Sequence, residues 1–199
     1  MATAVAQTVY SVNVVGYVTV TLQPGFNMVA NPLNAATNTV AAVLTGVPEG
    51  TTVYKFNSDT GAFSINAFSF GEWAVPDQSF APGEGAFINV PGTAPVTVTF
   101  VGEVMQGDLS TPIPAGFSIK SSQVPQELPL TTDATHTQSL NFPAAEGDTI
   151  YTWDTSTKSY GIHSFAFGEW NVNPIPKLGE AFFVKKAAAA NWTRTFTVD

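Results

Sequence analysis

The sequence predicts an all-β protein built from two tandem homologous β-sandwich or barrel-like units, related by a pseudo-twofold axis and containing at most short helical turns. Three observations lead to this prediction. The 16 glycines and 14 prolines interrupt the chain every few residues, which disfavours long helices. Several segments alternate apolar and polar residues with the two-residue period of a half-buried strand. The third observation is an internal repeat, which indicates two copies of one structural unit.

The repeat is visible when the sequence is aligned with itself. Residues 49–73 match residues 146–170 without a gap, and 11 of these 25 positions are identical. The match continues downstream, where residues 82–87 correspond to residues 178–183 after one deletion, and upstream, where residues 14–26 resemble residues 105–117. We therefore divide the chain into a short leading segment at 1–7, a first β repeat at 8–101 and a second β repeat at 102–199.

The individual elements follow from local patterns in chain order. A long alternating strand is predicted near 9–22, and residues 39–44 can form one or two helical turns with Asn38 as a candidate cap. Alternating strands at 52–56 and 149–153 run into turns at 57–61 and 154–158, whose Asn, Asp and Gly residues tolerate left-handed backbone angles. Further strands are predicted at 62–66, 86–90, 96–101, 159–163 and 192–197. A loop insertion is expected near 131–135.

Composition and charge narrow the function classes. The net charge of −8 and a pI near 4.5 argue against nucleic acid as a partner, because phosphates repel such a surface. The chain has no cysteine, which excludes disulfides and thiolate chemistry, and no apolar stretch long enough for a membrane span. The small-x-small pattern Ala4-Val5-Ala6 resembles a signal-peptidase site, so we predict a secreted or cell-surface protein whose signal is removed near Ala6. The alternative is an Ala-rich N-terminal arm.

The motif Phe-x-Phe-Gly-Glu-Trp occurs at 68–73 and again at 165–170. One interpretation makes Trp73 and Trp170 platforms that stack on sugar rings, with Glu72 and Glu169 hydrogen-bonding the hydroxyls. The other, which we favour, is a packing corner in which the aromatic side chains fill the core and the glutamate caps a tight turn. The repeated tyrosines are further candidate ligand-binding residues: Tyr54 and Tyr151.

Candidates for catalysis are weak. Glycoside hydrolysis needs two carboxylates in unlike environments, but Glu72, Glu84, Glu169 and Glu180 all lie in duplicated turns. In the second repeat, His163, Glu169, Asp148 and His136 are the residues that could form a base or acid pair. No motif for a cofactor and no local metal-ligand spacing is present, so neither is predicted. Asp59, Asp148 and Asp154 lie near turns and leave Ca²⁺ as an alternative without a dense acidic loop.

A longer pattern resembles a known family. The segments Gly25–Leu33, Val53–Phe56 and Pro82–Phe87 resemble an extracellular bacterial β module with the pattern GWNLIGNP…YVYN…PGQGFFV, and residues 10–18 look like the mature start of uncharacterised exported proteins of Verrucomicrobia-like bacteria. The resemblance covers nearly the whole chain and implies a β fold and export. It departs in the second repeat, where Ser121-Ser122-Gln123 replaces the Ala-Asn-Pro corner. It implies no catalytic residues.

Three function classes remain open on the sequence. The first is an exported non-catalytic β module for surface structure, adhesion or assembly, in which exposed strand edges favour a homo-oligomer. The second is a glycan-binding module that recognises a polysaccharide or a cell-surface component through the repeated aromatic residues. The third is a secreted hydrolase that acts on polysaccharide or ester substrates near His163 and Glu169.

Overall fold

The computed structural model describes residues 14–198, so the predicted segment 1–7 lies outside the described residues. The strands and the helical turn of the first unit are β1 (Val15–Leu22), β2 (Gly25–Ala30), α1 (Val40–Val43), β3 (Thr52–Asn57), β4 (Ala62–Ser69), β5 (Glu72–Trp73), β6 (Gly85–Val90) and β7 (Val96–Glu103). Those of the second unit are β8 (Gly107–Ile113), β9 (Gly116–Lys120), β10 (Thr149–Asp154), β11 (Ser159–Ala166), β12 (Glu169–Trp170), β13 (Phe182–Lys186) and β14 (Ala190–Phe196).

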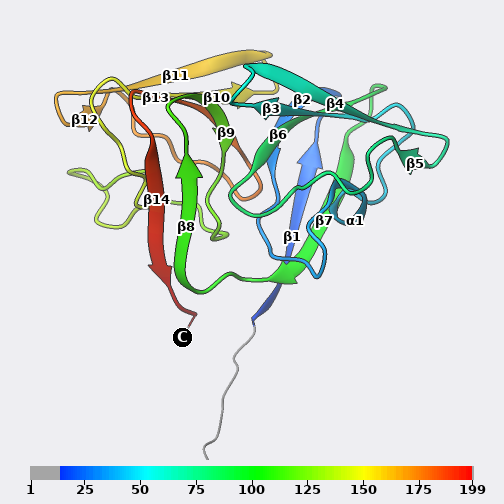
Figure 1. Ribbon diagram of the computed structural model, residues 1–199, viewed down its shortest axis with the longest axis horizontal. Coiled ribbons are helices and arrows are strands. Elements are labelled where there is room, and N and C mark those ends of the chain that lie inside the picture. The colour runs from blue at the N-terminus through cyan, green and yellow to red at the C-terminus, as the bar shows by residue number, and fades with distance from the viewer. Residues whose placement is uncertain (1–13, 199) are drawn as a thin grey trace, which may run out of the picture.

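The two units have the same topology, which confirms the predicted all-β fold of two similar units. Each contains a five-stranded antiparallel sheet, in the order β2-β6-β3-β4-β5 or β9-β13-β10-β11-β12. The first and last strands of each unit pair as a separate ribbon, β1 with β7 and β8 with β14. Figure 1 shows the two large sheets along the top of the molecule, with the two ribbons extending below them.

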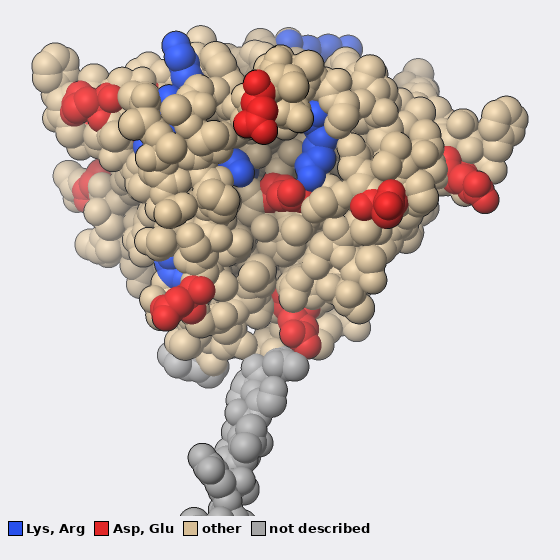
Figure 2. All heavy atoms as spheres, viewed as in Figure 1, with Lys and Arg blue, Asp and Glu red and all other residues tan. Residues whose placement is uncertain are grey.

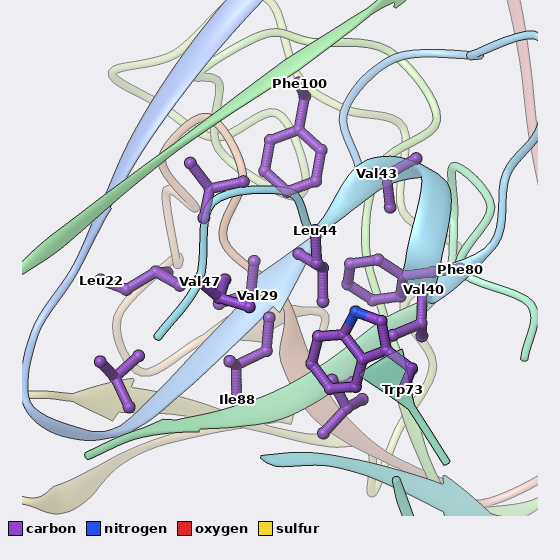
Figure 3. Packing of buried hydrophobic residues seen from close by; sticks show 14 of the residues in the cluster. Leu22, Val29, Val40, Val43, Leu44, Val47, Trp73, Phe80, Ile88 and Phe100 are labelled. Carbon is purple, nitrogen blue, oxygen red and sulfur yellow. The ribbon is translucent and has the colours of Figure 1, made fainter. Parts of the chain in front are cut away.

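Each unit closes its sheet and its ribbon over a hydrophobic core. In the first unit, Val29 and Ile88 of the large sheet pack with Phe100 of the ribbon and with Phe80 from the connecting loop (Figure 3). In the second unit, Phe142, Phe182 and Trp192 occupy the core, and the rings of Phe142 and Trp192 lie 5.2 Å apart. Burial of such large apolar side chains is the main source of stability, at about 1.5–3 kcal/mol each.

The helical turn differs from the prediction in its cap. The backbone of Thr39 is extended and occupies the N-cap position of α1, without a side-chain hydrogen bond to the helix. The Asn38 side chain instead holds the preceding loop, because its Oδ1 accepts from the Ala35 N–H (3.0 Å) and its Nδ2 donates to Asn34 Oδ1 (2.7 Å). The prediction of Asn38 as the cap was therefore wrong. Since α1 is only four residues long, no helix of residues 14–198 is long enough to cross a membrane.

Reciprocal backbone contacts join the two units about the pseudo-twofold axis. Val29 of β2 forms a bridge with Glu180, and Lys120 of β9 forms the equivalent bridge with Glu84. The Ala30 N–H donates to the Gly179 carbonyl (2.8 Å), and the Ser121 N–H donates to the Gly83 carbonyl (3.2 Å). Met28, Ala30 and Phe87 of the first unit also belong to the core cluster of the second. The two repeats therefore share part of their interior.

Gly85 lies at a close contact between the two units, and it is the repeat equivalent of Ala181. A Cβ atom at Gly85 would lie 2.4 Å from the Ala181 Cβ and 2.6 Å from a methyl group of Ile119. We expect Gly85→Ala to lower the free energy of unfolding by about 1–3 kcal/mol, because overpacking forces neighbouring backbone apart. Chemical denaturation measures this loss. Gly85→Ala combined with Ala181→Gly removes the Cβ–Cβ clash and keeps the approach to Ile119, so it should recover part of the loss, and a double variant as unstable as the single one would contradict this account.

Candidate functional site

The tryptophans of the repeated motif are buried. Trp73 and Trp170 are only 6% and 7% exposed, and each packs against the first phenylalanine of its own motif, with ring centroids 5.2 Å from Phe68 and 5.1 Å from Phe165. An indole that fills the core offers no face to a sugar ring. The interpretation of Trp73 and Trp170 as stacking platforms is therefore corrected, and the packing interpretation describes these two side chains.

The glutamates of the motif do not cap its turn. Glu72 and Glu169 are exposed on the two-residue strands β5 and β12. The turn is held by a glutamate from a distant segment, because the Phe70 and Gly71 N–H groups donate to the two carboxylate oxygens of Glu49 at 2.8 and 2.7 Å. In the second unit Phe167 and Gly168 donate in the same way to Glu146 at 3.0 and 2.7 Å.

The two histidines have separate structural partners. His163 Nδ1 lies 2.9 Å from the carbonyl of Val172, so this nitrogen carries the proton, and Nε2 lies 3.1 Å from the Thr152 hydroxyl. Its repeat equivalent Asn66 donates to the carbonyl of Val75 (2.8 Å), so each residue tethers the equivalent loop of its own unit. His136 Nδ1 contacts the carboxylate of Asp133 at 2.9 Å, within the inserted loop.

The last catalytic candidate, Asp148, forms a buried ion pair with Lys186. Both side chains are almost fully inaccessible, and Lys186 Nζ also donates to the Pro143 carbonyl at 2.6 Å. The carboxylate of Asp148 accepts two backbone N–H groups, from Ala145 (2.8 Å) and Ala187 (3.0 Å). Asp148 thus crosslinks loops of the second unit. Among the hydrogen bonds and ion pairs described above, no partner is shared by any two of the four candidates, His163, Glu169, Asp148 and His136.

The acidic residues near the predicted turns also have local roles. Asp154 Oδ1 accepts from the Ser156 hydroxyl (2.6 Å) and from the N–H groups of Ser156 and Thr157 (2.8 and 3.2 Å). These hydrogen bonds, led by the Ser156 hydroxyl, lower the pKa of Asp154 to about 2. In the first unit Asn57 holds the equivalent turn, accepting from the Asp59 and Thr60 N–H groups. Within residues 14–198, no three His, Asp or Glu side chains form a group that could hold a metal ion.

A surface of aromatic side chains in tilted and edge-to-face contact forms where the two large sheets meet, and its inner members pack on the core cluster of the second unit. We call this surface the aromatic face. Its members come in repeat-equivalent pairs and are Phe26, Tyr54, Phe56, Phe63 and Phe87 of the first unit, with Phe117, Tyr151, Trp153, Tyr160 and Phe183 of the second. They lie on β2, β3, β4 and β6 and on the equivalent strands β9, β10, β11 and β13.

The rings of the aromatic face connect the two units. Phe56 lies 5.2 Å from Phe183, and the equivalent pair Phe87 and Trp153 lies at 5.5 Å, both nearly edge to face. Phe87 and Phe183, which are equivalent to each other, meet at 6.1 Å. The Trp153 Nε1–H donates to the carbonyl of Phe26 (2.8 Å). Aromatic pairs at these distances add about 0.5–1.5 kcal/mol beyond their burial.

The aromatic face is partly open and almost without charge. Its outer rings are about 42–43% exposed, and two isoleucines on the same sides of β4 and β11, Ile65 and Ile162, are 63% and 58% exposed. Lys185 is the charged residue that contacts it, with Nζ 5.7 Å from the centre of the Phe117 ring. Figure 2 shows that acidic and basic side chains are scattered over the view of the protein drawn there. Exposed apolar patches on a soluble protein mark sites of interaction.

Sequence reasoning found only part of this face. Tyr54 and Tyr151 were predicted as binding residues, and they contact Phe26 at 5.4 Å and Phe117 at 5.9 Å. The other members were not singled out from the sequence, although Phe56 aligns with Trp153 and Phe63 with Tyr160 in the repeat. The signal was the two-residue period, which places residues 54 and 56 on the same side of their strand.

The turns of the repeated motif expose one phenylalanine at each end of the molecule. Phe70 and Phe167 are 100% and 99% exposed and adopt left-handed φ angles of 55° and 56°, each followed by a left-handed glycine. The hairpins of β5 and β12 lie at opposite ends of the view in Figure 1. A bulky residue in the first position of such a two-residue turn is unfavourable, because Asn-Gly is the preferred pair.

We therefore expect Phe70→Asn and Phe167→Asn to raise the free energy of unfolding by up to about 1 kcal/mol each, because strain is relieved and no packing is lost. Denaturant midpoints measure the change. The matched substitutions Phe68→Asn and Phe165→Asn, whose rings pack on the buried tryptophans, should destabilise the protein. A loss of stability at Phe70 or Phe167 would show that these rings contribute to the fold.

Comparisons with protein-family models, with curated proteins and with solved structures gave no match.

Proposed function

We propose that this protein is an exported, non-catalytic module of an extracellular assembly, and that copies of the chain associate through the aromatic face. The observation that supports this most directly is the exposure of Phe26, Phe63, Ile65 and their repeat equivalents on one continuous, nearly uncharged surface. Apolar side chains that stay half exposed in a free chain gain hydrophobic stabilisation when a partner removes them from water.

A second copy of the chain is the partner that this surface fits. A closed two-fold contact applies the same patch of each copy to the other, and the aromatic face, with its equivalent rings on both units, offers one continuous patch for this. The chain carries a net charge of −8, so two copies repel each other wherever carboxylates meet. The charged residue that contacts the aromatic face is Lys185, so association through this face avoids the repulsion between carboxylates.

Glycan binding is less well supported by the ring geometry. Sugar rings stack on aromatic side chains that lie flat and accessible, whereas neighbouring rings of the face meet at steep angles, for example 57° between Phe26 and Tyr54 and 83° between Tyr151 and Tyr160. The two tryptophans of the repeated motif are buried. These observations favour contact with another apolar surface over contact with a saccharide.

Charge introduced into the face tests the proposal. We expect the wild-type chain to show concentration-dependent association in sedimentation velocity, and the double variant Ile65→Lys/Ile162→Lys to remain monomeric at the same concentrations. Both isoleucines are exposed, so the folded state should lose less than about 0.5 kcal/mol.

A matched control is available on the same hairpins. Val75→Lys/Val172→Lys changes two exposed, repeat-equivalent aliphatic residues outside the aromatic face and should associate like the wild type. A monomeric wild-type chain, or equal association of all three proteins, would contradict the proposal. Binding of immobilised polysaccharide that is lost in the isoleucine variant and kept in the control would replace assembly with glycan recognition.

A further inference from the structure

A groove of about 510 Å³ separates the ribbon of the first unit from the second unit. One wall is the continuous segment 17–23, which includes most of β1. The opposite wall contains Thr152 and Trp153 of β10 and the segment 176–182 before and at the start of β13. The charged residues that line it are Glu127, Lys177 and Glu180. Its volume is within the range of specific ligand sites.

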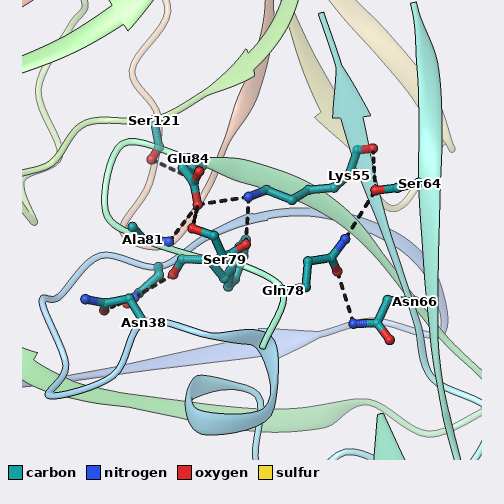
Figure 4. Close-up of polar contacts among 11 residues, drawn as sticks. Asn38, Lys55, Ser64, Asn66, Gln78, Ser79, Ala81, Glu84 and Ser121 are labelled. Carbon is teal, nitrogen blue, oxygen red and sulfur yellow. Dashed lines mark hydrogen bonds and ion pairs between the residues drawn. The ribbon is translucent and has the colours of Figure 1, made fainter. Parts of the chain in front are cut away.

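The repeat-equivalent groove, of about 570 Å³, lies between the end of β8 and the turn at 57–59, and the glutamate that bridges its lining residue Lys120 is already paired with a lysine. Lys55, which corresponds to Thr152, reaches Glu84, which corresponds to Glu180, with Nζ 2.9 Å from Oε2 (Figure 4). The same Nζ donates to the carbonyl of Ser79 at 2.6 Å. Lys120, which corresponds to Val29 of the groove, lies beside this pair. The chain thus supplies an ammonium group to this glutamate from within.

The pKa of the Glu84 carboxyl reflects its contact with the Lys55 ammonium group. Burial alone raises the pKa of the Glu84 carboxyl, but the charge and hydrogen bond of Lys55 and the hydrogen bonds from the Ala81 N–H and the Ser79 hydroxyl outweigh it. The net effect is a lowered pKa. The carboxylate is therefore kept charged by the ammonium group that it binds.

The second unit retains the glutamate, as Glu180, but has a threonine at the position of Lys55. Glu180 accepts the Lys177 N–H (3.0 Å), just as Glu84 accepts the Ala81 N–H (2.8 Å). Thr152 is too short to reach Glu180 as Lys55 reaches Glu84, and its hydroxyl instead contacts His163. Among the ion pairs of residues 14–198, none involves Glu180, which is exposed to the groove.

The strand that borders the groove also differs between the units, because β1 can accept a further strand and its equivalent β8 cannot. Among residues 14–198, β7 is the one strand that pairs with β1, and no other described strand covers the second edge of β1. The equivalent strand β8 carries Pro112 where β1 has Thr21, and proline blocks strand addition because it has no N–H. Since Pro112 lies opposite Asn191 within the β8–β14 ladder, its nitrogen must point to the open edge. The Thr21 N–H of β1 accordingly faces the groove.

We propose that this groove binds an extended, lysine-bearing peptide of a partner protein, which adds as a strand to the open edge of β1 and places its ammonium group on Glu180. Backbone hydrogen bonds to β1 supply affinity, and the lysine position supplies register and selectivity. Lys55 on Glu84 is the intramolecular counterpart of this contact. The site is distinct from the aromatic face and does not depend on assembly through it.

The test uses the full chain and fluorescent hexapeptides of alternating valine and threonine, with one lysine moved through the central positions. We expect at least one register to bind saturably in fluorescence anisotropy. Replacing that lysine with norleucine, or methylating the peptide backbone nitrogens that face β1, should weaken binding by about tenfold or more. Amide signals of Thr19 and Thr21 should shift in NMR spectra when the peptide is added.

Three variants test the contacts, and the first two of them copy the residues at the repeat-equivalent positions. Thr152→Lys supplies the internal ammonium, Thr21→Pro blocks the edge, and Glu180→Gln removes the charge of the carboxylate while keeping a side-chain oxygen that can accept the Lys177 N–H. Each should weaken the peptide by about tenfold, whereas Thr157→Lys, on the exposed turn after β10, should not. Absence of saturable binding in every register overturns the proposal. Unchanged affinity in Glu180→Gln also overturns the proposal. A peptide that binds equally well after backbone methylation and is displaced by glucosamine overturns it too.

Discussion

Replacing Asp148 with alanine is expected to lower the free energy of unfolding by about 3–5 kcal/mol, because it leaves the charge of Lys186 buried without its counterion. Lys186 would retain the Pro143 carbonyl and the ring of Phe142, whose centroid lies 5.5 Å from Nζ. Two backbone N–H groups, of Ala145 and Ala187, would also lose their acceptor. Urea denaturation followed by far-UV circular dichroism measures the loss.

The first unit provides the matched rescue. At the equivalent positions it has Thr51 and Val90, which are 0% and 1% exposed and carry no charge. The double variant Asp148→Thr/Lys186→Val should recover most of the stability, since a buried ion pair can be replaced by packed neutral side chains at little cost. Asp77→Ala, at an exposed acid, should change stability by less than about 0.5 kcal/mol. A double variant as unstable as Asp148→Ala would show that the pair itself is required.

Truncation of Phe87 is expected to have an effect of similar size, about 3–5 kcal/mol. Its ring is 6% exposed and lies within 6.4 Å of five others, three of which belong to the second unit. Phe87→Ala therefore opens a cavity at the place where the units meet. We expect the denaturant midpoint to fall and the near-UV circular dichroism of the packed rings to weaken.

Two variants separate this packing role from the exposed part of the aromatic face. Phe87→Leu keeps most of the volume and should cost less than about 1.5 kcal/mol. Phe26→Ala removes a ring that is 43% exposed and should cost clearly less than Phe87→Ala. If Phe26→Ala proved as damaging, the outer rings would serve the fold and would no longer support an interaction surface.

The fold was predictable because its signals are local or repeated. The match of residues 49–73 with 146–170 fixed the two-unit architecture, and alternation in residues 52–57 fixed the sides of β3. The same alternation placed Tyr54 on the surface that the structure reveals as aromatic. These patterns depend only on neighbouring residues, so a single sequence is sufficient to read them.

The site was less predictable because its contacts join distant segments. Nothing in the sequence pairs Glu49 with the turn at Phe70, although both are identical in the two repeats. The meeting of Phe87 with Trp153 depends on how the units dock, which alternation does not encode. Likewise, the different partners of Glu84 and Glu180 become visible only when Lys55 and Thr152 are seen beside them.

The reciprocal bridges from Val29 to Glu180 and from Lys120 to Glu84 have a consequence for the chain as a whole. A single repeat cut from the chain would expose Met28, Ala30 and Phe87, which find their surroundings in the sister repeat. Such a fragment would be complete only as a pair of identical halves. Fusion of the halves in one polypeptide removes the demand that they stay identical. One glutamate, Glu84, can then be paired with a lysine of the chain while its equivalent, Glu180, stays exposed to a groove.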